Sequence, residues 1–87
     1  MTRQDVEKKL SAIFSTRFSI DFIQDPEMKQ VKLLGKSGIP AREMIYVYFD
    51  VKNEFGISIP ENDVVEGRFD TYDHIVSIVI EQLTNKL

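Results

Sequence analysis

The stretch NEFGISIPEN, from Asn53 to Asn62, decides how the chain folds, because it ends one helix and resets the segment that follows. Gly56 can adopt the left-handed conformation that closes a helix at its C-terminus. Beyond it, Ile57 and Ile59 lie on an extended step that directs both side chains inward. Pro60 then begins a short helical turn. The stretch therefore predicts a helix end, a buried crossing and a helical restart.

The segment before Gly56 predicts a helix that starts near Pro40, a residue suited to the first helical position because it needs no hydrogen-bond donor there. Its polar residues form only a small solvent-exposed face. Its apolar stripe consists of Met44, Tyr48, Val51 and Phe55, and Ile45 and Phe49 widen that stripe.

A second helix is predicted near the N-terminus, where apolar residues recur at three- and four-residue spacing and so share one face. Thr2 followed by Asp5 resembles a capping pattern, in which the hydroxyl serves an orphan amide of the first turn. The apolar face consists of Val6, Leu10, Ile13, Phe14 and Phe18.

The last segment begins at Asp70 or Thr71, either of which is a good N-cap. Its stretch HIVSIVI is rich in β-branched residues and, taken alone, is typical of a strand. No partner strand exists elsewhere in the sequence, and the capped length suits a helix, so we predict a helix. Its apolar residues are Tyr72, Ile75, Val76, Val79, Ile80 and Leu83.

The connection from about Ser19 to Ile39 is too apolar for a free linker. We expect an ordered crossover that lies on the core, with a short helical turn from Glu27 to Lys32. Its apolar residues are Ile20, Phe22, Ile23, Val31, Leu33 and Leu34. The chain of 87 residues is therefore predicted to form a single all-α domain, with three main helices, one short helix and a long loop between the first two main helices.

Composition excludes several classes of protein. The chain has no cysteine and one histidine, which argues against disulfides and a structural zinc site. A net charge of −3 with scattered lysines argues against nucleic acid as a partner. No stretch has the length of a membrane span, and the N-terminus lacks the apolar middle of a signal peptide, so we expect a cytoplasmic monomer.

The pattern from Leu33 to Leu83 resembles the acyl and peptidyl carrier protein family. The matching features are the Leu-Leu-Gly run at Leu33, the helix that ends in EFGISIP, the short helix after it, and the last helix, FDTYDHIVSIVIEQL. More narrowly, the stretch GIPAREMIYVYFDVKNEFGISIPENDVVEG resembles a carrier-related group associated with bacterial peptide-maturation systems. The resemblance implies an acyl-carrier-like bundle over residues 1–87.

The family carries 4′-phosphopantetheine on a serine at the start of its second helix and is not itself an enzyme. Counted back from Phe55, that position falls on Ala41, which has no nucleophilic oxygen. Counted forward from Gly35, it falls near Ser37. Two interpretations of Ser37 stay open: it is the attachment point after a lengthened loop, or Lys-Ser-Gly is simply a turn.

The resemblance also implies partners: enzymes of a biosynthetic or peptide-modifying pathway, with a phosphopantetheinyl transferase among them. Family members dock through an acidic second helix. Here we expect the docking residues to be Arg42, Glu43, Tyr46 and Asp50. Aromatic residues reduce the acidic character of this face. We therefore expect weaker electrostatic steering and more specific docking through apolar contacts. Two alternatives stay open. In the first, Tyr46 is a core or half-buried residue. In the second, the whole domain is an unmodified adaptor without a prosthetic group.

Other candidate sites are interpreted structurally. Asp70, Asp73 and His74 are typical of a helix start rather than of acid–base catalysis, so no catalytic residue is predicted. Glu61, Asn62 and Asp63 lack the ligand spacing of a calcium loop, so no metal site is predicted. Val64 and Val65 either flank a cavity for an acyl group or fill the core.

Overall fold

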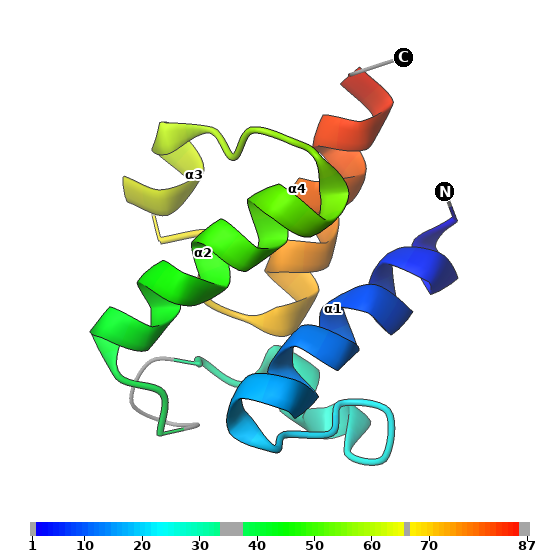
Figure 1. The fold of residues 1–87 in the computed structure, drawn as a ribbon, viewed down its shortest axis with the longest axis vertical. Helices are drawn as coiled ribbons and strands as arrows, with labels where there is room; N and C mark the ends of the chain where they lie inside the picture. Colours follow the sequence, from blue (N-terminus) through cyan, green and yellow to red (C-terminus); the bar gives the residue numbers. More distant parts are fainter. Residues whose placement is uncertain (1, 34–37, 66, 86–87) are drawn as a thin grey trace.

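The chain folds into helices that pack on one another in the order shown in Figure 1. The computed structural model describes residues 2–33, 38–65 and 67–85, and these residues form no β-strand. The elements are α1 (Arg3–Phe18), the 3-10 helix η1 (Pro26–Gln30), α2 (Ala41–Phe55), α3 (Glu61–Val65) and α4 (Tyr72–Asn85). The all-α prediction is confirmed, including the helix over the β-branched run of α4. Within the described ranges, no helix is long and apolar enough to cross a membrane.

The helix ends follow the capping signals in the sequence. The Thr2 hydroxyl accepts a hydrogen bond from the Asp5 amide at 3.2 Å, and the Asp5 carboxylate accepts one from the Thr2 amide at 3.1 Å. Gly56 ends α2 in the left-handed conformation, with φ of 61°. Thr71 rather than Asp70 caps α4, since its hydroxyl accepts from the His74 amide at 3.1 Å. Pro40 differs from expectation by one residue, because it is the N-cap of α2 and not its first helical residue.

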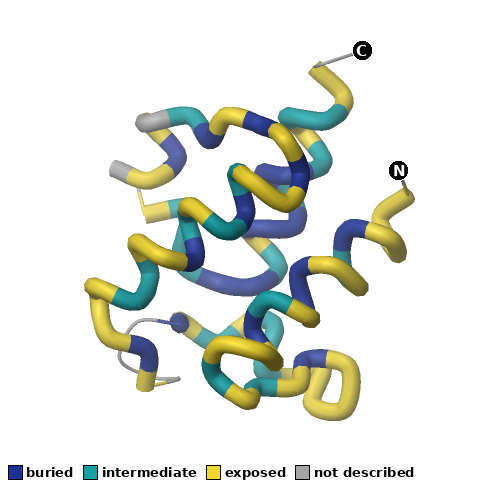
Figure 2. Tube along the Cα trace, in the orientation of Figure 1, coloured by how far each residue is buried: buried dark blue, intermediate teal, exposed yellow. Residues whose placement is uncertain are grey.

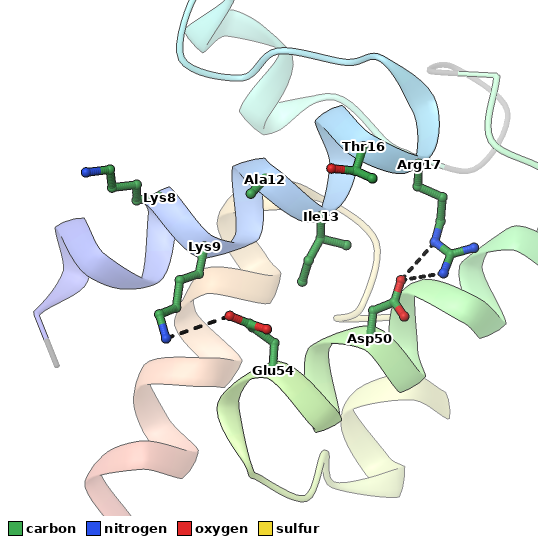
Figure 3. Close-up of a pocket in the computed structure, with 8 residues that line it drawn as sticks. All are labelled: Lys8, Lys9, Ala12, Ile13, Thr16, Arg17, Asp50 and Glu54. Carbon is green, nitrogen blue, oxygen red and sulfur yellow. Dashed lines mark hydrogen bonds and ion pairs between the residues drawn. The ribbon is translucent and has the colours of Figure 1, made fainter.

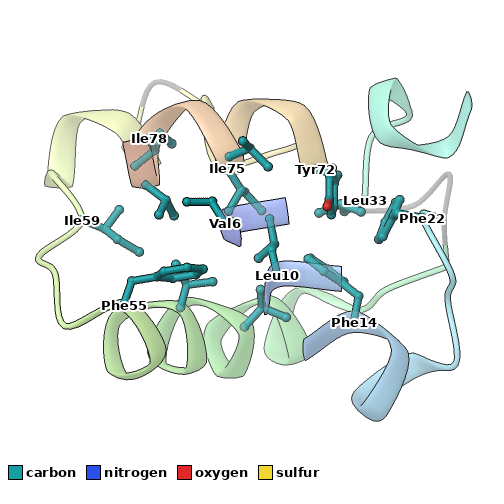
Figure 4. Packing of buried hydrophobic residues seen from close by; sticks show 14 of the residues in the cluster. Val6, Leu10, Phe14, Phe22, Leu33, Phe55, Ile59, Tyr72, Ile75 and Ile78 are labelled. Carbon is teal, nitrogen blue, oxygen red and sulfur yellow. The ribbon is translucent and has the colours of Figure 1, made fainter. Parts of the chain in front are cut away.

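The core lies where α1, α2 and α4 converge, as the buried segments in Figure 2 and the side chains in Figure 4 show. Ile57 and Ile59 point into it, as predicted for the extended step after α2. α1 contributes Val6, Leu10 and Phe14; α2 contributes Val47, Val51 and Phe55; α4 contributes Tyr72, Ile75, Val76, Ile78 and Val79.

The predicted stripe of α2 is partly wrong. Met44 and Tyr48 pack against the core as half-buried residues, and Val47, which the stripe omitted, is fully buried. Ile45 and Phe49, which were expected to widen the stripe, are exposed instead. The reason is helical geometry: with 100° between successive residues, Ile45 and Phe49 lie on nearly the opposite side of α2 from Val47.

The connection between α1 and α2 is ordered on the core over its described residues, as expected. Phe22 and Leu33 are fully buried, and η1 contacts α4 at the place where a short helical turn was predicted. The ring of Phe22 stacks on Tyr72 with 4.4 Å between centroids and meets Phe14 edge-on at 5.2 Å. Ile23 was counted among the packing residues, but its side chain is exposed.

Tyr72 ties three parts of the chain together. Its ring lies between α1 and the connection, and its hydroxyl donates to the main-chain oxygen of Glu7 at 2.8 Å. Since that proton is used, the Ser11 hydroxyl is the donor in the 2.8 Å bond between Ser11 and Tyr72. Burial raises the pKa of Tyr72 above its ordinary value, so the phenol stays protonated as this network requires.

Removal of the Tyr72 hydroxyl should therefore destabilise the fold. We expect Tyr72→Phe to lower the free energy of unfolding by about 1–3 kcal/mol, because the buried Ser11 hydroxyl loses its acceptor and the part-buried oxygen of Glu7 loses the phenol donor. Urea unfolding followed by circular dichroism measures the change. The same substitution at exposed Tyr46 is the matched control and should change stability by less than about 0.5 kcal/mol. Equal effects at the two positions would contradict this role of Tyr72.

Candidate functional site

An apolar groove of about 540 Å³ lies between α2 and the segment that runs from α3 to the start of α4. Its walls are mostly apolar and include three aromatic residues, and Ala41 marks the end nearest the start of α2. Among the described residues that line it, Asp70 is the only charged one. The lining side chains that project into the groove are Met44, Ile45, Tyr48, Phe49, Val64 and Phe69. An open groove of this kind suits an apolar group rather than a charged one.

The rim of the groove holds large apolar side chains that are open to solvent. The exposed fraction is 57% for Ile45, 50% for Phe49 and 42% for Val64. Tyr48 sits deeper, with Phe49 and Phe69 edge-on to it at 5.5 and 6.0 Å between ring centroids. Val64 therefore flanks a groove rather than filling the core.

A second cleft, of about 680 Å³, separates α1 from α2 and has a different chemistry (Figure 3). Arg17 of α1 reaches across it, with Nε and Nη2 lying 2.8 and 2.6 Å from Oδ2 of Asp50. Nearer the other end of the cleft, Lys9 lies 3.7 Å from Glu54. The acids that α2 turns toward this cleft are therefore already paired within the fold.

The structure separates the four predicted docking residues into two groups. Tyr46 and Asp50 meet through Arg17, whose guanidinium lies 5.4 Å from the Tyr46 ring centroid while it pairs with Asp50. Tyr46 is 53% exposed, so the alternative that placed it half-buried in the core is wrong. Arg42 is exposed and Glu43 is half-buried in the first turn of α2. The docking role of all four residues stays a prediction.

Ser37 lies outside the described residues, but the ends of its segment are placed. The Ile39 amide donates to the Leu33 oxygen at 3.4 Å, so the chain returns close to where it left. Leu33 is anchored in turn, because its amide donates to the Asp70 oxygen at 2.8 Å. Gly38 has φ of 78°, a conformation that favours glycine. The segment that carries Ser37 thus begins and ends beside the starts of α2 and α4.

The start of α2 has no side-chain cap. Pro40 occupies the N-cap and makes no side-chain hydrogen bond, while its oxygen accepts from the Glu43 and Met44 amides at 3.0 and 3.2 Å. The amides of Ala41 and Arg42 precede the first intrahelical bonds and stay available to an acceptor. Such a helix start fits a phosphodiester carried on a nearby side chain.

Asp70 links the connection between α1 and α2 to the start of α4. Its carboxylate accepts a hydrogen bond from Lys32 Nζ and lies 2.5 Å from His74 Nδ1. Partial burial by itself would raise the pKa of Asp70, but the hydrogen bonds from Lys32 and His74 outweigh it and hold that pKa below its ordinary value. These contacts join the connection to the start of α4 through Asp70 and His74; the absence of a catalytic role for these residues stays a prediction.

Two groove residues were missed by sequence reasoning. Phe69 half-buries its ring against Tyr48, and Gly67 lines the groove with φ of 81°. The available signal was an aromatic residue inside a short polar connection, which rarely lacks a packing partner. Asp63, which was considered as a cation ligand, instead binds Arg68 at 2.7 Å.

The contacts of the Asp70 carboxylate with Lys32 and His74 predict that the free energy of unfolding depends on pH. A carboxyl whose folded-state pKa lies below the unfolded value of about 3.9 stabilises the fold above that value and loses this contribution as the pH falls through the folded pKa. We expect Asp70→Asn to lower the free energy of unfolding by up to about 1 kcal/mol at pH 7. The difference from the unmodified chain should shrink below about pH 4 in urea titrations.

The matched control is Asp25→Asn, since Asp25 is exposed and forms no side-chain hydrogen bond at the start of η1. At pH 7 this substitution should change the free energy of unfolding by less than about 0.5 kcal/mol, because it removes no side-chain hydrogen bond. A pH-independent effect of Asp70→Asn would contradict the stabilising role of the Asp70 carboxylate.

Comparison of the chain with family models, with curated proteins and with solved structures gave no match. The chemistry of the site is therefore inferred from its own residues.

Proposed function

We propose that the chain is an acyl-carrier-like protein, which presents a phosphopantetheine-tethered acyl or aminoacyl group to enzymes of a biosynthetic or peptide-modifying pathway. The single observation that carries this proposal is the apolar groove, which starts beside Ala41 at the head of α2 and runs toward α3. A carrier needs an apolar surface of this kind beside the attachment point, because its cargo and its enzymes both approach there. The order of three long helices and one short helix, with a packed first connection, agrees with a carrier-like bundle.

Ser37 is the proposed attachment residue. The Ile39 amide donates to the Leu33 oxygen, so the two ends of the segment that carries Ser37 meet. They meet within a few residues of the start of α2, which has no side-chain cap. A phosphodiester on Ser37 would interact with two elements of the chain: the amides of Ala41 and Arg42 would donate hydrogen bonds to its oxygens, and the groove would receive an apolar group beyond it. The prosthetic group would supply the thiol that the chain, without cysteine, does not have.

A second candidate function is an unmodified adaptor that binds partner enzymes without a prosthetic group. Two observations favour it. Ala41, with no hydroxyl, stands at the first helical residue of α2. The exposed apolar face of α2 also exists independently of any modification, because Ile45 and Phe49 project from the helix itself. In this function the groove would be a protein-docking surface alone.

Mass spectrometry of the intact chain separates the two functions. After co-expression with a broad-specificity phosphopantetheinyl transferase, we expect the chain to gain the mass of one phosphopantetheine group. Ser37→Ala should abolish the gain, because the hydroxyl that forms the phosphodiester is removed. Ser58→Ala is the matched control, since Ser58 is an exposed loop serine at the other end of α2, and it should leave the gain intact. Absence of an adduct with several transferases would reject the carrier and leave the adaptor.

A further inference from the structure

The charges of α2 are segregated between two sides of the helix. Its three acids, Glu43, Asp50 and Glu54, are spaced by seven and four residues and therefore share one side. That side faces α1, where Arg17 binds Asp50 and Lys9 binds Glu54 (Figure 3). The fold thus uses two of the three acids internally and turns all three away from the outer face of α2.

The outer face of α2 is apolar with a cation at each end. Arg42, Ile45, Phe49 and Lys52 follow one another at spacings of three, four and three residues, which form a single stripe on a helix. Among the residues that the structure describes, neither Arg42 nor Lys52 forms an ion pair; Lys52 only lies over the Tyr48 ring, at 5.7 Å from its centroid. With a rise of 1.5 Å per residue, the two cations are about 15 Å apart along the axis.

Stability of the helix does not explain this arrangement. Lys52, in the last turn, complements the negative end of the helix dipole. Arg42 is in the first turn, where the dipole opposes a cation, and no acid of the described chain neutralises it. The whole chain carries a net charge of −3, so the positive outer face of α2 is a local inversion. Unpaired cations around an exposed apolar stripe are suited to a partner with the opposite charges.

We infer that the groove and the outer face of α2 bind an amphipathic helix of a partner enzyme, and that this helix carries carboxylates at both ends of its apolar stripe, opposite Arg42 and Lys52. The inference rests on the proposed function only in taking the partner to be an enzyme that the domain serves. Apolar side chains of the partner helix enter the groove between Phe49 and Phe69, while its acids reach the two cations. The polarity is the reverse of an acidic helix that meets a basic patch.

The charges of α2 favour a partner helix over a second copy of this chain. If two copies met through α2 about a two-fold axis, the outer stripe of one would face the outer stripe of the other. Arg42 would then lie opposite Lys52 or Arg42 of the second copy, and like charges would meet. An extended strand is also disfavoured, because the described residues offer no sheet edge for it to join.

A displayed peptide library tests the inference without knowledge of the natural partner. The probe is a helical peptide of about 18 residues, which spans about 27 Å, with a fixed leucine stripe and flanking positions randomised between Glu and Lys. Selection uses the full chain produced without a transferase. We expect Glu to be enriched at both flanks on the unmodified chain and Lys on the double variant Arg42→Glu, Lys52→Glu. The selected acidic peptide should bind that variant about tenfold more weakly in low salt.

Two further variants make the result specific. Arg3→Glu with Lys8→Glu changes the net charge by the same amount on α1, where both residues are exposed and unpaired, and should enrich Glu as the unmodified chain does. Phe49→Ser should abolish enrichment of every peptide while leaving the helical circular dichroism unchanged. Enrichment of the same flanking charge on all variants, or enrichment that survives Phe49→Ser, would overturn the inference. So would the absence of any enriched peptide.

Light scattering addresses the second copy as occupant. A dimer of the unmodified chain that dissociates in Phe49→Ser would show that α2 pairs with itself, and the inference would be wrong. A monomer at the concentrations used for selection agrees with it. Because the selection contains no prosthetic group, failure to modify Ser37 would reject the carrier function and leave the peptide result standing. Failure of the peptide selection would leave the mass result standing in the same way.

Discussion

The stacking of Phe22 on Tyr72 is the contact on which the rest of the structure depends. A connection of this length has no regular hydrogen-bond ladder, so burial of Phe22 and Leu33 must fix its path. Tyr72 receives the ring on one side and holds α1 through its hydroxyl on the other. Further along the connection, Leu33 also reaches the start of α4, where its amide donates to the Asp70 oxygen.

Asymmetry of α2 links this core to the proposed function. One side of α2 packs on the core through Val47, Val51 and Phe55, while a second side pairs its acids with bases of α1. The outer face of α2 is therefore apolar, with a cation at each end. A helix that uses its acids internally cannot offer them to a partner. The internal ion pairs thus change the kind of surface that another protein would meet, even though exposed pairs contribute little to stability.

The sequence predicted the helices well, because their signals are local. Caps at Thr2 and Gly56 depend on one or two residues each and were found from them, and the cap of the last helix was narrowed to Asp70 or Thr71, of which Thr71 is the cap. The face that α2 buries was harder, since Met44 to Phe49 are six consecutive apolar or aromatic residues. Periodicity cannot orient such a run. Its orientation depends on where α1 and α4 lie, which is a property of the whole chain.

The candidate site was less predictable than the fold for the same reason. The groove joins α2 to Val64 and Phe69, and no local pattern relates those positions. The placement of Tyr72 also affects the optical properties of the protein. The chain has no tryptophan and three tyrosines, of which only Tyr72 is fully enclosed and held against other rings. The near-ultraviolet ellipticity of the tyrosines should therefore include a contribution from Tyr72 that reports whether the first connection is docked.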